Sequence, residues 1–306
     1  MKKLSKKNPK LSIVVLNHNT KDLLYDCLVS LEKVKDEVVF RIIVSDNGST
    51  DGSLEMLEHD FPEVVVIKSP ENLGFSAGNN RARKYCDSKY ILFLNSDTVV
   101  KPGTIKETTT YLDDHPEVGA ITCKILLPDG SLDRDARRSF ITPWIGLVHL
   151  FLRLDRIFPN SKTFARYWYG YLSPDLVHEV DAIQGAYFMA RKDVLEKVGW
   201  WDEDYFLDGE DIDLSYRIHQ AGYKIVYYPK VEIIHYRGAT KGKIKNNGHK
   251  VSLSEKIKFR TTGVTSQEIF YKKHLWNKHS LILNLTVIAG IKFLKLLRII
   301  KTVLLG

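Results

Sequence analysis

Short apolar runs alternate with amphipathic segments through the first hundred residues, and this order restricts the fold more than any other feature. The segments between the runs carry apolar side chains at helical spacing, as in residues 21–34. Strands that are apolar throughout are typical of a parallel sheet covered on both faces. The order therefore predicts an α/β fold with a doubly wound, mostly parallel sheet. The four runs lie at residues 11–19, 40–49, 64–70 and 90–97.

The rest of the chain divides into segments of different composition. Residues 140–180 are apolar and aromatic, and they predict either an extension of the core or a partly exposed lip. From Asp181 the pattern of helices and strands returns. The resulting division has a basic N-terminal tail (1–10), the α/β domain (11–238), a basic mobile loop rich in Gly and Asn (239–262) and a C-terminal helical extension (263–306).

The C-terminal segment has the pattern of a basic amphipathic helix, which suits a membrane interface with anionic lipids. Docking of this helix on the domain is the alternative. No uncharged apolar stretch reaches eighteen residues, so we expect no simple transmembrane helix. The apolar side of the helix consists of Phe293, Leu296, Leu297, Ile300, Val303 and Leu304. The opposite half carries Lys292, Lys295, Arg298 and Lys301.

Net charge and cysteine content narrow the partners and the compartment. The net charge of +8 favours an anionic partner: nucleotide phosphates, an acidic membrane or nucleic acid. Because the basic residues gather in the tail, the loop and the C-terminal helix, a membrane is favoured over nucleic acid. Three cysteines without a Cys-x-x-Cys pair argue against a disulfide framework or a zinc site. We expect a cytoplasmic protein, peripheral on the inner face of the cell membrane.

Polar clusters follow four predicted strands. The carboxyl ends of parallel strands meet at one rim of a sheet, where ligands bind. Any single cluster is more simply explained as a turn, so the convergence of four carries the prediction. Asp97 follows a buried strand, where a carboxylate could hold a divalent cation that bridges a diphosphate. The clusters are Asn17-His18-Asn19, Asp46-Asn47-Gly48-Ser49, Glu71-Asn72 and Asn95-Ser96-Asp97.

A second polar group lies within the stretch FLDGEDIDLSYRIHQAG at residues 206–222. Glu210 and Asp211 would begin a helix, where the helix dipole favours acids, so an ordinary helix start is the structural alternative. Asp211 shares a helix face with Leu214 and Ile218, which would point its carboxylate inward. An inward carboxylate beside an apolar face is a candidate general base.

Three other side chains carry weaker predictions. Asp213 and Arg217 stand four residues apart, and we expect them to pair on the solvent side of the helix. His235 follows a strand-like run, and it is either a further metal ligand or a structural histidine.

Seven segments follow one another between residues 11 and 238: IVVLNHNTKDLLYDCLVSL, VSDNGSTDGS, ENLGFSAGNN, FLNSDTVV, GAYFMARKDVLEKVGWWDEDYF, GEDIDLSYRIHQAG and IIHYRG. In this order they resemble the family-2 inverting glycosyltransferases of the GT-A fold. The resemblance is close to the rhamnosyltransferase-like branch, which builds bacterial surface polysaccharides. It covers about three-quarters of the chain.

The resemblance implies a role for each matching position. Asn95-Ser96-Asp97 stands in place of the Asp-x-Asp motif, which makes Asp97 the metal ligand, and His235 would complete that site. Asp211, with Glu210 beside it, would be the catalytic base. Asp46 would hydrogen-bond the nucleobase. The nucleotide or donor sugar is expected to contact Leu16, Asn17, Asn19, Asp46, Asn72, Gly74, Asn79, Asn95, Ser96 and Gly185.

Two departures from the family pattern stand out. Asn95 replaces the first acid of Asp-x-Asp, so the affinity for metal is expected to be lower. Trp200 and Trp201 replace the usual Gly-Phe or Phe. We expect Trp200 in the core, whereas Trp201 either stacks on a sugar or fills the core.

The reaction implied is a single displacement with inversion, assisted by Mg²⁺ or Mn²⁺. A sugar, rhamnose among the candidates, would pass from a UDP- or dTDP-sugar to a hydroxyl of a glycan or polyprenyl-linked acceptor in surface polysaccharide synthesis. A non-catalytic nucleotide-sugar or membrane-binding module with the same fold is the alternative. A Rossmann dehydrogenase is disfavoured, because LNHNTKD lacks the Gly-x-Gly-x-x-Gly motif after the first strand.

Overall fold

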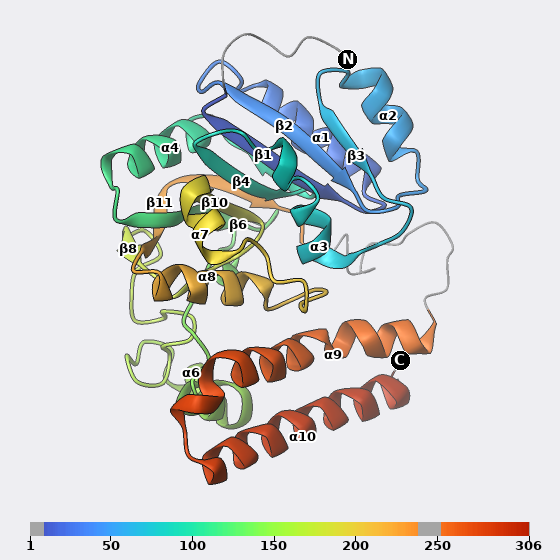
Figure 1. Cartoon of the computed structure of the whole chain (residues 1–306). Coiled ribbons are helices and arrows are strands. Elements are labelled where there is room, and N and C mark those ends of the chain that lie inside the picture. The colour runs from blue at the N-terminus through green and yellow to red at the C-terminus, as the bar shows by residue number, and fades with distance from the viewer. Residues whose placement is uncertain (1–8, 238–251, 306) are drawn as a thin grey trace.

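A nine-stranded sheet forms the centre of the computed structural model, which describes residues 9–237 and 252–305 (Figure 1). The strands follow the order β3-β2-β1-β4-β10-β6-β11-β5, and β8 pairs with β11. The first four neighbours run parallel, as the apolar runs predict. They are β1 (Leu11–Asn17), β2 (Phe40–Asp46), β3 (Val65–Lys68) and β4 (Tyr90–Asn95).

Antiparallel strands complete the sheet and make it mixed. β10 pairs antiparallel with both β4 and β6, whereas β11 runs parallel to β6. The end of β11 pairs with β5, and this register sets His235 opposite Thr98. The end of β11 therefore lies next to the turn that follows β4. These strands are β5 (Thr98–Val100), β6 (Val118–Leu126), β8 (His178–Glu179), β10 (Tyr187–Arg191) and β11 (Lys224–His235).

Helices cover the sheet through stripes of apolar side chains. In α1, Leu24, Cys27, Leu28 and Leu31 recur at a spacing of three and four residues, and all are buried. Helix α8 lies between the sheet and α9 (Figure 1). The helices of this domain are α1 (Lys21–Glu32), α2 (Ser53–Asp60), α3 (Gly74–Asn80), α4 (Thr104–Asp114), α7 (Lys192–Val198) and α8 (Glu210–Gln220). Short 3-10 turns occur at Arg83–Tyr85 and Arg134–Ala136.

Both tryptophans after α7 belong to the core. Trp200 is fully buried, as predicted, and Trp201 is 2% exposed. The Trp201 ring contacts Phe75, Phe93 and Phe188 at centroid distances of 5.2, 4.9 and 5.3 Å in edge-on geometry. This packing leaves the Trp201 ring no open face for a sugar.

The segment at residues 140–180 forms a partly exposed lip, the second of the two predicted alternatives. Ile145, Val148 and Tyr167 are buried, whereas Trp144 and Ile157 are 51% and 65% exposed. The helical part of the lip consists of α5 (Pro143–Gly146), a π-helical turn η3 (Leu147–Leu152) and α6 (Leu154–Ile157). A two-stranded ladder of β7 (Arg137–Arg138) and β9 (Ala182–Ile183) ties the lip to the domain.

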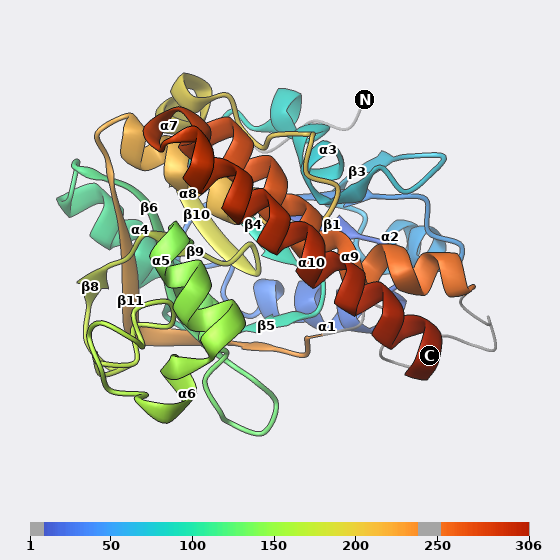
Figure 2. The ribbon, with the colours of Figure 1, turned by 90° about the horizontal axis from the view of Figure 1, so that it is seen from below.

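Two long helices, α9 (Leu253–Phe270) and α10 (Leu281–Leu305), lie side by side at the end of the chain (Figure 2). Turns at Tyr271–Leu275 and Trp276–Lys278 connect them. The prediction of a loop over residues 239–262 is wrong from Leu253 onward, where the chain is helical. The polar sequence of this part suggested a loop, but packing against α10 stabilises the helix. Residues 239–251 lie outside the described residues.

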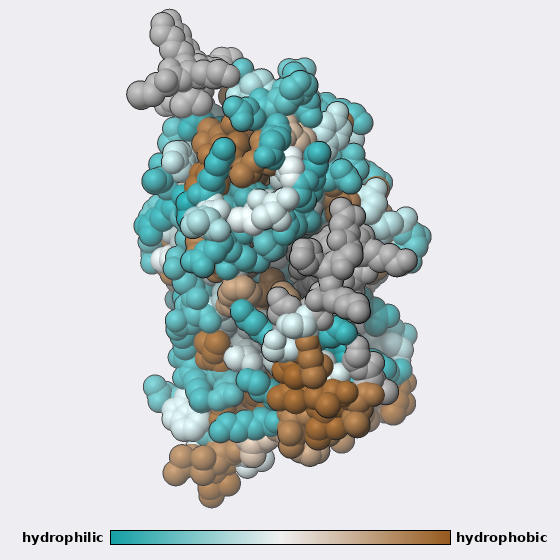
Figure 3. Space-filling view, turned by 90° about the vertical axis from the view of Figure 1, so that its right-hand side faces the viewer, coloured by the Kyte–Doolittle hydropathy of each residue, from teal (hydrophilic) through white to brown (hydrophobic). Residues whose placement is uncertain are grey.

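Helix α10 docks on the rest of the protein, the alternative to a membrane interface, and binding to a membrane stays a prediction. Ile291 and Thr302 are buried against the rest of the protein. The predicted apolar face is nevertheless exposed: Phe293 by 54%, Leu296 by 52% and Leu304 by 75%. Apolar side chains gather at the end of the molecule where α10 lies (Figure 3). Within the described residues, no helix combines the length and apolar character needed to span a bilayer.

Candidate active site

A cavity of about 330 Å³ opens at the carboxyl ends of β1 and β4, facing the start of α8. Ten of the fourteen site residues predicted from the sequence line it. Asp97 and Asp211, the two carboxylates on which the prediction depends, therefore share one cavity. The predicted residues in its wall are Leu16, Asn72, Gly74, Asn95, Ser96, Asp97, Gly185, Glu210, Asp211 and His235.

The other four predicted residues support the wall without lining it. Asn17 donates to the Asp46 carboxylate at 2.9 Å, and both side chains are fully buried. Asn19 accepts from the backbone N–H of Thr50 at 2.8 Å. Asn79 donates to a backbone carbonyl inside its own helix. The direct contact with a nucleotide predicted for these side chains stays a prediction. In this structure the polar groups of Asn17, Asn19 and Asp46 hold the strand-end loops together.

The pairing of β11 with β5 brings His235 to Asp97. The His235 Nε2 lies 3.3 Å from Asp97 Oδ1, and the ring's Nδ1 lies 3.1 Å from Asp133 Oδ2. Burial by itself lowers the pKa of His235, but hydrogen bonds and charges from Asp133 and Asp97 raise it to about 9. The sequence offered no signal for Asp133, which is fully buried and fixes the orientation of the imidazole.

The Asp97–His235 pair is the part of the cavity that could hold a cation. A carboxylate oxygen and an imidazole nitrogen side by side are ligands that Mg²⁺ or Mn²⁺ accepts, and such ions often take further ligands from substrate phosphates. A carboxylate on the far nitrogen of the histidine is typical of metal-binding histidines. No cluster of three or more His, Cys, Asp or Glu side chains that could hold a metal occurs among residues 9–237 and 252–305. The residues present thus fit a cation whose remaining ligands come from the phosphates of the substrate.

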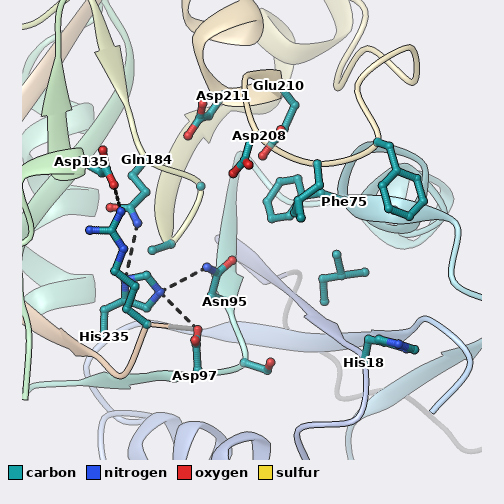
Figure 4. Close-up of a pocket in the computed structure, with 18 of the residues that line it drawn as sticks. His18, Phe75, Asn95, Asp97, Asp135, Gln184, Asp208, Glu210, Asp211 and His235 are labelled. Carbon is teal, nitrogen blue, oxygen red and sulfur yellow. Dashed lines mark hydrogen bonds and ion pairs between the residues drawn. The ribbon is translucent and has the colours of Figure 1, made fainter. Parts of the chain in front are cut away.

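Two acids at the start of α8 form the opposite wall (Figure 4). Gly209 precedes them with a φ of 89°, a conformation that glycine adopts without strain. Burial, together with the charges of Asp211 and Asp208, raises the pKa of Glu210 well above its usual value. This shift favours the neutral form of Glu210, whose side chain lies beside Asp211 at the start of the helix.

The Asp211 carboxylate contacts Arg138, a residue that the sequence analysis missed. The Arg138 guanidinium donates to Asp211 Oδ2 at 2.5 Å, and Asp211 Oδ1 accepts from the Ile212 N–H at 2.8 Å. Burial alone would lower the pKa of Arg138, but the charge of Asp211 raises it. Each carboxylate oxygen keeps a second lone pair that can accept a further hydrogen bond. The β7–β9 ladder positions Arg138, and nothing local in the sequence marks it.

The position predicted for Asp213 is wrong, although its pairing with Arg217 is confirmed. Asp213 is fully buried, and its other oxygen accepts from His274 Nε2 at 2.6 Å. The segment after α9 covers this side of α8, so the side that helical periodicity assigned to solvent is an interface. Asp213 thereby ties α8 to the C-terminal helices.

Comparisons with known proteins agree with this geometry. The family described as Glycosyl transferase family 2 matches residues 12–199. An N-acetylglucosaminyl-diphospho-decaprenol L-rhamnosyltransferase of Mycobacterium tuberculosis is 27% identical over 246 residues, which cover 76% of this chain and 78% of that protein. Rhamnosyltransferase WbbL of Escherichia coli is 26% identical over 232 residues, which cover 73% of this chain and 82% of that protein.

Solved structures share the fold at low sequence identity. GalNAc-T7 with UDP, GalNAc and Mn²⁺ superposes with a TM-score of 0.57 at 16% identity, over 87% of this chain and 50% of that one. The mannosyltransferase PcManGT of Pyrobaculum calidifontis, with GDP-Man and Mn²⁺, superposes with a TM-score of 0.51 at 15% identity. The match covers 98% of this chain and 87% of that one. These likenesses establish the GT-A fold.

Proposed function

The chain belongs to glycosyl transferase family 2, and from this premise we propose that it moves a sugar, with rhamnose the leading candidate, from a nucleoside-diphosphate sugar to a hydroxyl of a lipid-linked glycan. The observation that carries the proposal is the shared cavity, in which the Asp97–His235 pair faces Asp211. The relatives named as rhamnosyltransferases support the choice of sugar.

The donor occupies the rim formed by the strand ends. Asn72, Asn95 and Ser96 present polar groups to the nucleotide and its diphosphate. Asp97 and His235 would hold Mg²⁺ or Mn²⁺, which supplies positive charge against the departing diphosphate. GalNAc-T7 and PcManGT with bound Mn²⁺ support a metal of this kind. Asp133 keeps the His235 imidazole aimed at that position.

Asp211 is the base of the reaction. From the start of α8, its carboxylate accepts the proton of the acceptor hydroxyl while that oxygen attacks the anomeric carbon from the face opposite the leaving group. One displacement of this kind inverts the configuration. Arg138 holds the Asp211 carboxylate in position.

The acceptor is presented at a membrane. The exposed apolar face of α10 supports insertion into the interface of a bilayer, and its basic residues suit anionic headgroups. The protein is then peripheral on the cytoplasmic face of the cell membrane. The relative named for a diphospho-decaprenol substrate supports a lipid-linked acceptor.

A donor panel tests the transferase proposal. Purified protein is incubated with Mn²⁺ or Mg²⁺ and each of a set of UDP-, dTDP- and GDP-sugars, and binding and release of nucleoside diphosphate are measured. We expect one donor class to bind and to be hydrolysed slowly without an acceptor. Binding without any release of diphosphate, with or without a lipid-linked acceptor, would favour the non-catalytic module instead.

A further inference from the structure

A second cavity, of about 560 Å³, lies between the lip and the pair of C-terminal helices. Its volume falls in the range of pockets that bind organic ligands. Apart from one charged edge, its walls are mainly aliphatic and aromatic. Leu147, Leu150 and Phe151 line it from the lip, and Val287, Ile291 and Leu294 line it from α10.

The charged edge joins this cavity to the active-site cavity. Asp135, Arg138, Asp208 and Arg237 line both cavities. Arg138 is the residue that contacts Asp211, so the apolar cavity begins beside the proposed base. The Arg237 side chain is half exposed, with its guanidinium between Asp133 and Asp135. A ligand that spans both cavities therefore meets polar groups, then charged groups, then hydrocarbon.

Helix α10 separates the apolar cavity from the exposed apolar face. The residues that line the cavity recur at a spacing of three and four, so they form one stripe of the helix. Phe293, which is 54% exposed, lies on the neighbouring side of the same helix, and Leu285, which is 56% exposed, lies on the side opposite the cavity. The cavity wall and the exposed apolar face therefore belong to one helix, so a hydrocarbon chain would meet apolar side chains on both sides of α10.

We propose that this cavity binds the hydrocarbon chain of a phosphate-linked lipid acceptor. The chain lies against the lip and α10, the phosphate lies near Arg237, and the sugar extends to Asp211. The inference rests on the proposed function and adds the site that selects the acceptor. A water-soluble glycan would gain nothing from such a wall, and the continuity with the catalytic cavity favours a substrate over a protein partner.

A series of acceptors with different chains tests the proposal. The probes are esters of N-acetylglucosamine diphosphate with alkyl chains of two, ten and twenty carbons, all presented in the same detergent. We expect kcat/KM to rise with chain length, by about tenfold or more from the shortest to the longest. Equal kcat/KM for the three probes would overturn the proposal.

Substitutions that fill the cavity test whether the dependence of kcat/KM on chain length arises there. Val287→Trp and Leu150→Trp place an indole in the cavity from opposite walls, and either should bring the ratio of long-chain to short-chain kcat/KM toward one. Val39→Trp is the matched control, because Val39 is 43% exposed and does not line the cavity. Retention of the full ratio in both filled variants, with native circular dichroism, would contradict the proposal.

A labelling experiment separates this inference from the transferase proposal. A twenty-carbon probe with a diazirine midway along its hydrocarbon chain is irradiated with the full-length protein, and the labelled residues are mapped by mass spectrometry. Labels on Leu150, Phe151 or Val287 support the lipid site even if no donor is ever turned over. Labels confined to the outer face of α10, or to a second copy of the chain, would overturn the lipid site while leaving the transferase proposal intact.

Discussion

The guanidinium of Arg138 contacts the carboxylate of Asp211 at 2.5 Å, and each side chain is only 10% exposed. The pair lies where the active-site cavity meets the apolar cavity. A buried ion pair contributes little net stability, but the loss of one partner leaves an uncompensated charge. We therefore infer that Arg138 fixes the position of Asp211, the proposed base.

Removal of Arg138 alone should destabilise the protein. Arg138→Gln leaves the Asp211 carboxylate buried without its cation, and we expect a loss of about 3–5 kcal/mol in the free energy of unfolding. Adding Asp211→Asn should recover part of this loss, because the unpaired charge is then gone. Urea denaturation of the two single variants and the double variant measures the coupling. Additive losses would show that the contact does not couple the two residues.

Asp211→Asn should abolish transfer while sparing the donor. The amide cannot accept the proton of the acceptor hydroxyl, so turnover should fall by about a thousandfold. The dissociation constant of the donor should stay within a few fold of the native value by calorimetry. Asp129→Asn, in an exposed turn, is the control. Turnover near the native rate in the Asp211 variant would remove Asp211 from the role of base.

Asp133→Asn should weaken metal binding without removing a direct ligand. Asp133 orients the His235 ring through a 3.1 Å contact, and the loss of such a partner lowers metal affinity by about 10–100-fold in other proteins. Titration of Mn²⁺ in the presence of the donor nucleotide, followed by calorimetry, gives the affinity directly. Asp97→Asn should lower the affinity for Mn²⁺ further, because it removes a proposed ligand. Unchanged Mn²⁺ affinity in both variants would place the metal elsewhere.

Asp213 should make the stability of the protein depend on pH in the acidic range. Burial raises its pKa, but the hydrogen bond from His274 and the charge of Arg217 lower it overall. A carboxyl whose folded pKa lies below its unfolded value of about 3.9 stabilises the fold above that value, and this contribution is lost as the pH falls through the folded pKa. Asp213→Asn should therefore be less stable than the native protein at pH 7, and the difference should shrink toward pH 3. A constant difference in urea denaturation at both pH values would contradict this account.

The exposed face of α10 should bind anionic vesicles. Phe293→Ser combined with Leu297→Ser removes two side chains that are 54% and 45% exposed, and the partition coefficient should fall by about tenfold or more. Co-sedimentation with phosphatidylglycerol-containing vesicles at low and high salt gives the coefficient. Val39→Ser, at a residue that is 43% exposed on the α/β domain and outside the lip, is the control. Equal losses in the two variants would show that α10 is not the membrane face.

Local pattern was enough to predict much of the fold and part of the site. The strands end at Asn17, Asp46 and Asn95, where the apolar runs stop. An apolar strand and the polar residues that end it are both encoded by a few neighbouring residues. The inward position of Asp211 followed from helical periodicity alone. The same periodicity misplaced Asp213. Periodicity shows only that the Asp213 side of the helix does not face the core, and it gives no information on whether a later segment of the chain covers that side.

The sequence by itself determined the parallel strands, the acids at the start of α8 and the apolar face of α10, because each depends on backbone hydrogen bonds and side-chain spacing over a few turns. Only the tertiary structure decided which distant groups meet. The pairing of β11 with β5 brought His235 to Asp97, the β7–β9 ladder brought Arg138 to Asp211, and the return of α10 past the lip created the apolar cavity. Such contacts depend on the path of the whole chain, and no short segment encodes them.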